Sequence, residues 1–397
     1  MQKELLTEKI KQTVEILNEK NIDMWLIFVK ESSAIHDPSL DIVVGTNVTW
    51  HSAFMIMKDG STHAFVGSLD VSNTKDCTAF ENVYGYLKSL KEPFVEFLYK
   101  YDPANIAVNY SKNTNLADGL THGMYLTLVD YLRDTKYLNR LISSEEIVSS
   151  LRGRKSAREI DLMRTSVKET ERIFDEVTGF IKPGRTEKEI AQFILGKVSE
   201  RGYETAWDVE HCPAVFTGPD TAGAHAGPTD RKVEKGHLLN IDFGVKINGY
   251  CSDMQRTWYI LRDGETDAPE NVKKGFYVLR DSIRLAGEKL KPGVTGCEVD
   301  DVARGHITSN GYDEYPHGLG HQLGRSAHDA GPGLFPRWEK YGTLPYIPLE
   351  KSQVFTIEPR LNVEGHGIVT MEEEVVLTES GCEYLSVPQT ELILIKG

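Results

Sequence analysis

Residues 182–203 read KPGRTEKEIAQFILGKVSERGY, and residues 291–312 read KPGVTGCEVDDVARGHITSNGY. The two stretches share eight residues without a gap: Lys-Pro-Gly, a Thr, a Glu, a central Gly and the closing Gly-Tyr. Pro-Gly before a capped helix is common, but eight matches in one register favour an internal duplication. We therefore expect two similar halves that face each other across a cleft.

The rest of the 397-residue chain is long enough for a second domain. Apolar residues at helical spacing through residues 5–17 predict an opening helix, and the apolar run at residues 24–29 predicts a buried strand. A capping-box pattern at residues 156–159 predicts the start of a long helix. We predict an N-terminal mixed domain over residues 1–145 and a second domain over residues 146–397.

The overall charge excludes some classes of partner. The formal net charge is −14, which repels phosphate backbones, so we expect no nucleic-acid partner. No stretch approaches the roughly 18–20 apolar residues that span a bilayer, so we expect no membrane partner. The five cysteines are scattered and form no C-x-x-C pair, which indicates neither a disulfide framework nor a thiolate zinc site. This pattern predicts a cytoplasmic protein.

The first candidate hairpin lies in the middle of the second domain. Residues 239–245, LNIDFGV, read as a buried strand, and residues 250–258, YCSDMQRTW, read as its return strand. Between them stands Asn248-Gly249, the strongest short hairpin signal. A two-residue turn at this place would put Asp242 opposite Gln255.

That register brings two carboxylates together. Asp253 lies two residues from Gln255, so it shares a face with Asp242 at about 7–8 Å between Cα atoms. Two carboxylates buried on one apolar face repel each other and cost several kcal/mol unless they are compensated. A shared divalent cation would compensate them. The alternative is that one Asp is exposed or paired with a cation such as Arg256.

The second candidate hairpin carries a similar pair. The run at residues 354–358, VFTIE, ends in Glu358, and after a Gly-His-Gly bend the run at residues 368–372, IVTME, ends in Glu372. Glutamate is depleted in strands, so its presence at both positions makes Glu358 and Glu372 candidate ligands. The two residues could face each other across the bend. Alternation along the strand puts Glu374 on the same face as Glu372, and the residues alone do not choose between them.

Residues 317–329, HGLGHQLGRSAHD, lie between the two hairpins and contain three histidines. The glycines predict a loop, and the missing Glu after the first His excludes a zincin helix. Four carboxylates and an imidazole make an oxygen-rich site that suits Mn²⁺, Co²⁺ or Fe²⁺ at least as well as Zn²⁺. Two ions that share carboxylate bridges can activate a bridging water and stabilise a tetrahedral oxyanion.

Together these motifs resemble the pita-bread metallopeptidase family, which includes methionine aminopeptidase, aminopeptidase P and prolidase. The motifs stand in family order: IDFG at 241–244, YCSDMQRT at 250–257, HGLGH at 317–321, TIEP at 356–359 and MEEE at 371–374. The resemblance implies an α/β (α+β) fold, in which a pita-bread catalytic domain with pseudo-two-fold halves follows a creatinase/prolidase-like N-terminal α/β domain.

The resemblance also implies roles for the metal ligands. Asp242 would chelate one ion, and Asp253 and Glu372 would bridge the two ions. His321 and Glu358 would bind the other ion. The family pattern therefore selects Glu372 over Glu374, and it makes Glu358 the residue that transfers protons for the bridging water.

Three further histidines match residues that contact the substrate. His225 and His328 would be catalytic, with His225 stabilising the intermediate, and His317 would line the pocket. Three positions depart from the family: Arg325 and Ala327 stand where aliphatic residues are usual, and Thr370 replaces an expected Arg. The Arg325 guanidinium could face solvent, pair with a protein carboxylate, or bind a substrate carboxylate.

The implied function is an exopeptidase that hydrolyses Xaa-Pro bonds in peptides, either an aminopeptidase P or a prolidase-like dipeptidase. It would use two divalent ions per chain, Mn²⁺ or Co²⁺ first and Zn²⁺ or Fe²⁺ as alternatives, and it would form a homodimer. A creatinase-like amidinohydrolase and a non-catalytic pita-bread binding module are the alternatives. Both typically lack the full set of five ligands, which this chain has.

Overall fold

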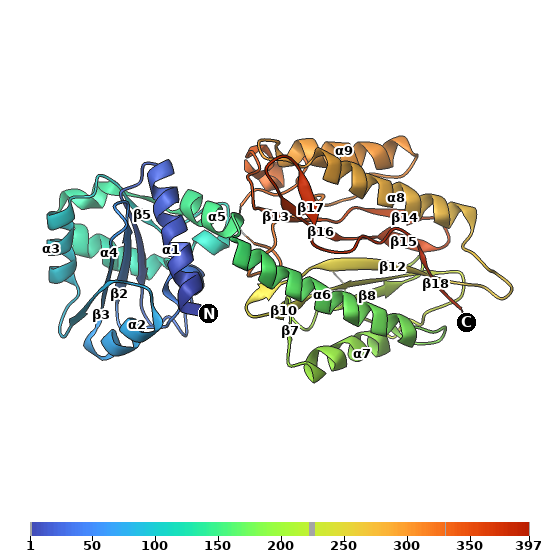
Figure 1. Ribbon diagram of the computed structural model, residues 1–397, viewed down its shortest axis with the longest axis horizontal. Helices are drawn as coiled ribbons and strands as arrows, with labels where there is room; N and C mark the ends of the chain where they lie inside the picture. Colours follow the sequence, from blue (N-terminus) through green and yellow to red (C-terminus); the bar gives the residue numbers. More distant parts are fainter. Residues whose placement is uncertain (1, 222–226, 330, 397) are drawn as a thin grey trace. The chain divides into compact units, whose positions relative to one another are not determined.

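The computed structural model describes residues 2–221, 227–329 and 331–396. The chain divides into two compact units, Met1–Arg152 and Gly153–Gly397 (Figure 1). The domain boundary after residue 145 stays a prediction, since the change between compact units follows most of the helix α5 (Glu145–Gly153). None of the described helices is both long enough and apolar enough to cross a membrane.

The first unit is built on one six-stranded sheet in the order β4-β3-β2-β1-β5-β6. Its strands are β1 Met24–Val29, β2 Ser52–Met57, β3 Thr62–Gly67, β4 Asn82–Tyr86, β5 Ile106–Val108 and β6 Leu141–Ser143. Its other helices are α1 Gln2–Glu19, α2 Val71–Cys77, α3 Lys91–Tyr101 and α4 His122–Leu132. The predicted opening helix and first strand are therefore confirmed as α1 and β1.

The central strand β1 is buried on both faces, which explains its continuous apolar sequence. Trp25 and Ile27 belong to one hydrophobic core, and their neighbours Leu26 and Phe28 belong to the other. Strand β1 pairs antiparallel with β2 and parallel with β5, so the sheet is mixed.

The second unit has four long helices around several small sheets. The helices are α6 Ala157–Phe180, α7 Glu187–Glu200, α8 Glu270–Lys289 and α9 Gly296–Ser309. The strands of its first half are β7 Glu204–Thr205, β8 Ala214–Thr217, β9 Leu238–Phe243, β10 Val245–Ile247, β11 Tyr250–Cys251 and β12 Met254–Ile260. Those of its second half are β13 Val354–Ile357, β14 Arg360–Val363, β15 Gly367–Thr370, β16 Glu373–Leu377, β17 Cys382–Tyr384 and β18 Ile393–Ile395. In Figure 1 the strands lie between α6 and α7 on one side and α8 and α9 on the other.

The duplication predicted from the sequence appears as the helices α7 and α9. Both have 14 residues, and both begin at a capping box. Glu189 accepts a hydrogen bond from the Thr186 N–H at 2.8 Å, and Glu298 accepts one from the Thr295 N–H at 2.9 Å. The glycines that close the two helices, Gly202 and Gly311, have positive φ angles of 67° and 89°, as a helix C-terminus commonly requires.

The first hairpin has the predicted register. Asp242 of β9 faces Gln255 of β12, and further along Lys246 faces Cys251. Asn248 and Gly249 have φ angles of 52° and 80°, as a two-residue type I′ turn demands.

The second hairpin also confirms the prediction. The ladders β13–β16 and β14–β15 share one register, in which position 358 faces position 372. An isolated bridge joins the two halves, because the Glu372 N–H donates to the Gln255 carbonyl oxygen at 3.2 Å.

Candidate active site

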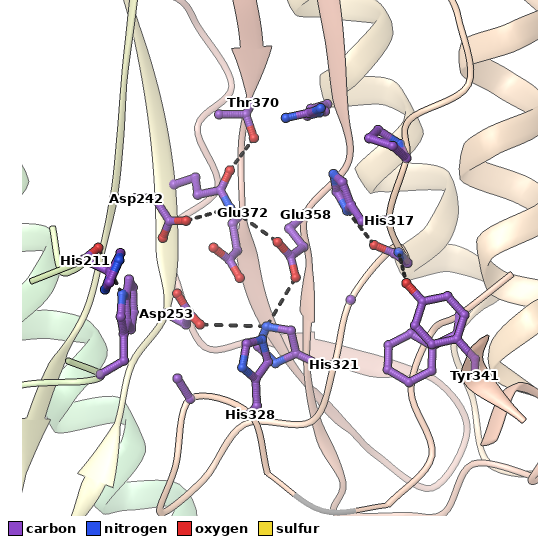
Figure 2. A pocket seen from close by; sticks show the side chains of 18 of the residues that line it. His211, Asp242, Asp253, His317, His321, His328, Tyr341, Glu358, Thr370 and Glu372 are labelled. Carbon is purple, nitrogen blue, oxygen red and sulfur yellow. Dashed lines mark hydrogen bonds and ion pairs between the residues drawn. The ribbon is translucent and has the colours of Figure 1, made fainter. Parts of the chain in front are cut away.

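A cavity of about 650 Å³ lies in the second unit, between the two hairpins and the histidine loop (Figure 2). All five predicted metal ligands line it: Asp242, Asp253, His321, Glu358 and Glu372. Asp242 comes from β9 and Asp253 from the start of β12, whereas Glu358 and Glu372 come from the second hairpin. Each half of the duplication therefore contributes two carboxylates.

Three of these residues are placed to hold one ion. Asp253, His321 and Glu372 each offer a ligand atom, and the three atoms lie within 4.8 Å of one another. His321 Nε2 lies 3.2 Å from Glu358 Oε1 and 3.8 Å from Asp253 Oδ2. His321 Nδ1 lies 3.2 Å from the Gln322 carbonyl oxygen, so a proton on Nδ1 would leave Nε2 as the ligand atom.

Burying these carboxylates in their charged form is energetically unfavourable when no cation is present. Burial raises the pKa of Asp242, Asp253 and Glu372 well above the usual range, and the negative charges of their neighbours raise each pKa further. For Glu358 burial also acts upward, but the hydrogen bond from His321 and the nearby histidine charges bring its pKa below the usual value.

Unpaired oxygen atoms in the cluster support the same conclusion. Asp242 Oδ1 and Glu372 Oε1 are buried and have no hydrogen-bond partner among the described residues. Buried polar atoms without partners are rare and destabilising. Divalent cations would satisfy these oxygens and remove the repulsion, so the residues present fit a metal centre.

Gln255 connects the two halves of the cluster. Its Nε2 donates to Asp242 Oδ2 at 3.4 Å and to Glu358 Oε2 at 3.3 Å. Its Oε1 accepts a hydrogen bond from the Thr370 hydroxyl, so the amide nitrogen is turned toward the two carboxylates. Thr370, which replaces an expected Arg, thus orients Gln255. The sequence singled out Gln255 only as the residue opposite Asp242, although that position already implied contact with the site.

The structure distinguishes among the three consecutive glutamates. Glu372 lines the cavity, whereas Glu374 Oε1 accepts the Asp253 N–H at 2.8 Å and lies outside the lining. Glu373 forms a buried ion pair with Arg256 at 3.1 Å. The alternative in which Arg256 pairs with Asp242 or Asp253 is therefore wrong.

Two of the three other predicted histidines line the cavity. The His328 ring lies against the His321 ring, with centroids 4.2 Å apart. His317 Nδ1 lies 2.8 Å from the Gly318 carbonyl oxygen, and burial lowers the pKa of His317 despite the opposing charge of Glu358. His225 lies outside the described residues.

Arg325 lies elsewhere. Its guanidinium carbon lies 5.4 Å from the centroid of the Tyr250 ring, and Arg325 is not among the residues that line the cavity. The structure therefore gives Arg325 an aromatic partner and gives no support to contact with a substrate carboxylate. The cavity does have two other cationic side chains, Lys340 and Arg360.

Comparisons with known proteins agree with this geometry. The sequence profile of Metallopeptidase family M24 matches residues 161–379. The chain belongs to this family. An uncharacterized peptidase of Bacillus subtilis, YqhT, is 30% identical over 280 residues, which are 70% of this chain and 73% of the relative. A Xaa-Pro dipeptidase of Pyrococcus horikoshii is 24% identical over 98% of this chain and 100% of its own.

Solved structures confirm the predicted fold of this M24 metallopeptidase over its full length. The X-Pro aminopeptidase from Thermotoga maritima has a TM-score of 0.73 and 26% identity, and the match covers 97% of this chain and 99% of the other. The Xaa-Pro dipeptidase from Bacillus anthracis has a TM-score of 0.76 and 22% identity, with coverage of 98% and 100%. The chain therefore has a pita-bread catalytic unit preceded by an N-terminal α/β unit, and it is an enzyme.

The walls of the metallopeptidase cavity were not predicted from the sequence. Trp207 and His211 line it from the first half, and Phe335 and Tyr341 line it from the second half. Phe335 and Tyr341 are stacked with centroids 4.4 Å apart, and the Tyr341 hydroxyl accepts the Gly318 N–H at 3.0 Å. These residues come from irregular segments, or for Tyr341 from the short 3-10 helix Glu339–Tyr341, so no periodic pattern marked them.

Proposed function

We propose that this metallopeptidase hydrolyses Xaa-Pro bonds near the end of short peptides, as a prolidase-like dipeptidase or an aminopeptidase P. The observation that carries this proposal is the cluster of four carboxylates and one histidine at the base of one cavity. The substrate class is supported by the likeness to enzymes named Xaa-Pro dipeptidase and X-Pro aminopeptidase, which extends over both units of the chain.

The five clustered residues would hold two divalent ions, with Mn²⁺ or Co²⁺ as the first candidates. We assign Asp242 to one ion, His321 and Glu358 to the other, and Asp253 and Glu372 to both. When bound, such ions polarise a carbonyl group and make water nucleophilic near neutral pH. The oxygen-rich donor set favours these metals over a closed zinc site.

The residues of the chain would then move protons and orient the substrate. Glu358, whose carboxylate lines the cavity beside His321, is placed to accept a proton from the attacking water. It would return that proton to the leaving proline nitrogen, which carries no hydrogen in the Xaa-Pro bond. His328 and His225 would donate to the oxygen on which negative charge develops, and His317 would contact the substrate from the opposite wall.

The stacked rings of Phe335 and Tyr341 give the cavity an aromatic wall. Figure 2 shows Tyr341 on the same side of the cavity as His317. We propose that the proline ring packs against this wall. A flat aromatic surface suits a rigid apolar ring better than a flexible polar side chain.

Two broader features belong to the same proposal. A homodimer is inferred from the prolidase branch, and light scattering should give twice the 44.6 kDa mass of one chain. A cytoplasmic location is inferred from the cysteines, because all five are free thiols. A monomer at micromolar concentration would contradict the first inference.

The deciding assay measures release of proline from an Xaa-Pro dipeptide after reconstitution with Mn²⁺, Co²⁺ or Zn²⁺. The matched substrate is the same dipeptide with Ala in place of Pro. We expect metal-dependent cleavage with a clear preference for proline. Equal cleavage of both peptides would contradict the Xaa-Pro assignment, and metal-independent hydrolysis of creatine would favour the amidinohydrolase alternative.

A further inference from the structure

Arg360, the first residue of β14, lines the active-site cavity and has a half-buried side chain. Among the described residues, no carboxylate, carbonyl oxygen or hydroxyl accepts a hydrogen bond from its guanidinium. A half-buried guanidinium without partners is unfavourable, so this side chain is available for a group that enters the cavity.

Other shielded arginines of the chain are paired. Arg256 binds Glu373 at 3.1 Å, and Arg304 binds Asp300 at 2.7 Å. Arg325, although it is part of the histidine loop, stacks on Tyr250 and does not line the cavity. Arg360 differs from these three because the described part of its surroundings provides no acceptor.

The position of Arg360 relative to the metal cluster is fixed by the second hairpin. Arg360 follows the proposed ligand Glu358 by two residues, which extended chain spans in about 6.6 Å. It also faces Thr370 across the β14–β15 ladder. Directly opposed residues share one face of a ladder, and Thr370 lines the same cavity. The guanidinium therefore lies on the cavity side of the hairpin, two residues along the chain from the proposed ligand Glu358.

Charge balance indicates what this guanidinium binds. Two divalent ions would neutralise the four clustered carboxylates, and Arg360 and Lys340 would then remain as the cationic side chains of the cavity lining. A dipeptide carries a free carboxylate one residue after the scissile carbonyl, whereas each added residue moves that carboxylate up to about 3.5 Å farther away. Arginine binds carboxylates with two parallel hydrogen bonds.

We propose that Arg360 binds the free carboxylate of the residue after the scissile bond, so that the enzyme prefers dipeptides to longer peptides. This proposal rests on the Xaa-Pro function and adds the group that selects substrate length. Lys340, which is exposed and lies over the rings of Trp338 and Tyr341, would lend a more distant positive charge.

The test compares three substrates: an Xaa-Pro dipeptide, its C-terminal amide and an Xaa-Pro-Xaa tripeptide. Arg360→Leu should lower kcat/KM for the dipeptide about tenfold to a hundredfold, mainly through KM, as expected when a charge-assisted hydrogen-bond pair is lost. Values for the amide and the tripeptide should change less than about threefold. Arg360→Lys should retain part of the preference for the dipeptide, because lysine keeps the positive charge but cannot donate two parallel hydrogen bonds to a carboxylate.

The matched control is Arg325→Leu, the same chemical change outside the cavity, which should leave the preference for the dipeptide over its amide unchanged. Metal content and melting temperature of each variant separate a specificity effect from damage to the fold. Equal losses on all three substrates in Arg360→Leu, or the same loss of preference in Arg325→Leu, would overturn the proposal.

A binding measurement keeps this result separate from the function itself. Calorimetry with L-proline and L-prolinamide should show tighter binding of L-proline to the metal-loaded wild-type protein, and this difference should vanish in Arg360→Leu. A wild-type protein that hydrolyses no Xaa-Pro peptide would contradict the proposed function. Equal binding of L-proline and L-prolinamide would contradict the role of Arg360, whatever the activity.

Discussion

The duplicated helices α7 and α9 match in length and in their capping boxes, yet they hold the loops beside the cavity in different ways. In the first half, Glu187 at the start of α7 is buried and accepts the N–H groups of Thr217 at 3.0 Å and Thr229 at 2.9 Å. It thereby fixes both ends of the segment that contains His225. Among the described residues, the donors to this carboxylate are the neutral N–H groups of Thr217 and Thr229 and the Thr229 hydroxyl.

The second half uses an ion pair for the same purpose. Arg304 of α9 donates to Asp300 and also to the carbonyl oxygens of Tyr315 at 2.7 Å and His317 at 2.8 Å. Asp300 accepts the Leu319 N–H at 3.1 Å. Both charged groups therefore form hydrogen bonds with the backbone at the start of the histidine loop.

The two anchors do not stand at equivalent positions of the repeat. Glu187 corresponds to Gly296, where an added Cβ would lie 1.9 Å from the Gly333 carbonyl oxygen. A carboxylate cannot stand at that position, so the second half places its anchor one helical turn later, at Asp300. The two halves therefore share the capped helix, but a different charged group of that helix holds the neighbouring segment in each half.

The largest effect is expected where the two halves meet, at the proposed metal bridge. Asp253→Ala in the first half and Glu372→Ala in the second should each abolish activity and reduce bound metal below two ions per chain, because each would remove an oxygen shared by both ions. Elemental analysis and the peptidase assay measure this. The control is Asp208→Ala. Asp208 lies with Glu210 and His211 in an exposed cluster and does not line the cavity, so this variant should keep both ions. Full metal content and activity in Asp253→Ala would contradict the ligand assignment.

The ion pair of the second half should matter most for stability. Arg304→Leu leaves the fully buried Asp300 without its partner, which typically costs about 3–5 kcal/mol. Denaturant unfolding measures the loss. Arg337→Leu is the matched control, since Arg337 pairs with the adjacent Asp301 at 2.7 Å on the surface, where pairs contribute about 0–1 kcal/mol. Equal losses in the two variants would show that the pair does not anchor the loop.

The comparison between halves extends to catalysis. His225→Ala and His328→Ala should keep both ions and lower kcat about 10²–10³-fold, the usual loss when a donor to a developing oxyanion is removed. Rate and metal content are measured together. Loss of metal would show that a histidine is a ligand, and unchanged turnover would show that it is structural.

The residue that joins the halves should tune metal affinity. Gln255→Leu removes the amide that contacts Asp242 and Glu358, and loss of a partner of a ligand typically weakens metal binding about 10–100-fold. Thr370→Val should have a smaller effect in the same direction because it only frees the amide. Competition with a chelator measures both affinities. An unchanged affinity in Gln255→Leu would assign the amide to the fold alone.

The sequence predicted the elements whose geometry is local. The Asn248-Gly249 turn fixes the register of the first hairpin, so the pairing of Asp242 with Gln255 follows from the residues alone. The choice of Glu372 over Glu374 could not be derived from alternation, because both lie on one face and only the arrangement in space separates them. The choice came from the family resemblance.

Side-chain contacts made by loop residues could not be predicted from the sequence, because loops have no periodic pattern that fixes where a side chain points. The Arg325 side chain leaves a glycine-rich loop without periodicity, so its direction toward Tyr250 had no signal. Arg360 follows the TIEP motif directly, but its environment depends on the opposite strand, where it faces Thr370, so the motif alone does not indicate its role. Trp207 and Tyr341 reach the cavity from separate loops.

The smallest expected effect tests the anchor of the first half. Glu187→Gln keeps the size of the side chain but replaces one acceptor oxygen with a donor that faces the Thr217 or the Thr229 N–H. We expect a loss of about 1–2 kcal/mol in unfolding free energy, which is the scale of one mispaired buried group. Thr229 also donates its hydroxyl to Glu187 at 2.6 Å. The substitution should therefore loosen Thr217 and Thr229, which stand before and after the proposed catalytic His225 in sequence, and kcat should fall with stability. Glu189→Gln is the control, since it weakens only the capping box of the same helix, and it should lower stability without lowering kcat at temperatures where the protein stays folded. If both variants lose stability and neither loses turnover, Glu187 contributes to the stability of the first half alone and has no role in catalysis.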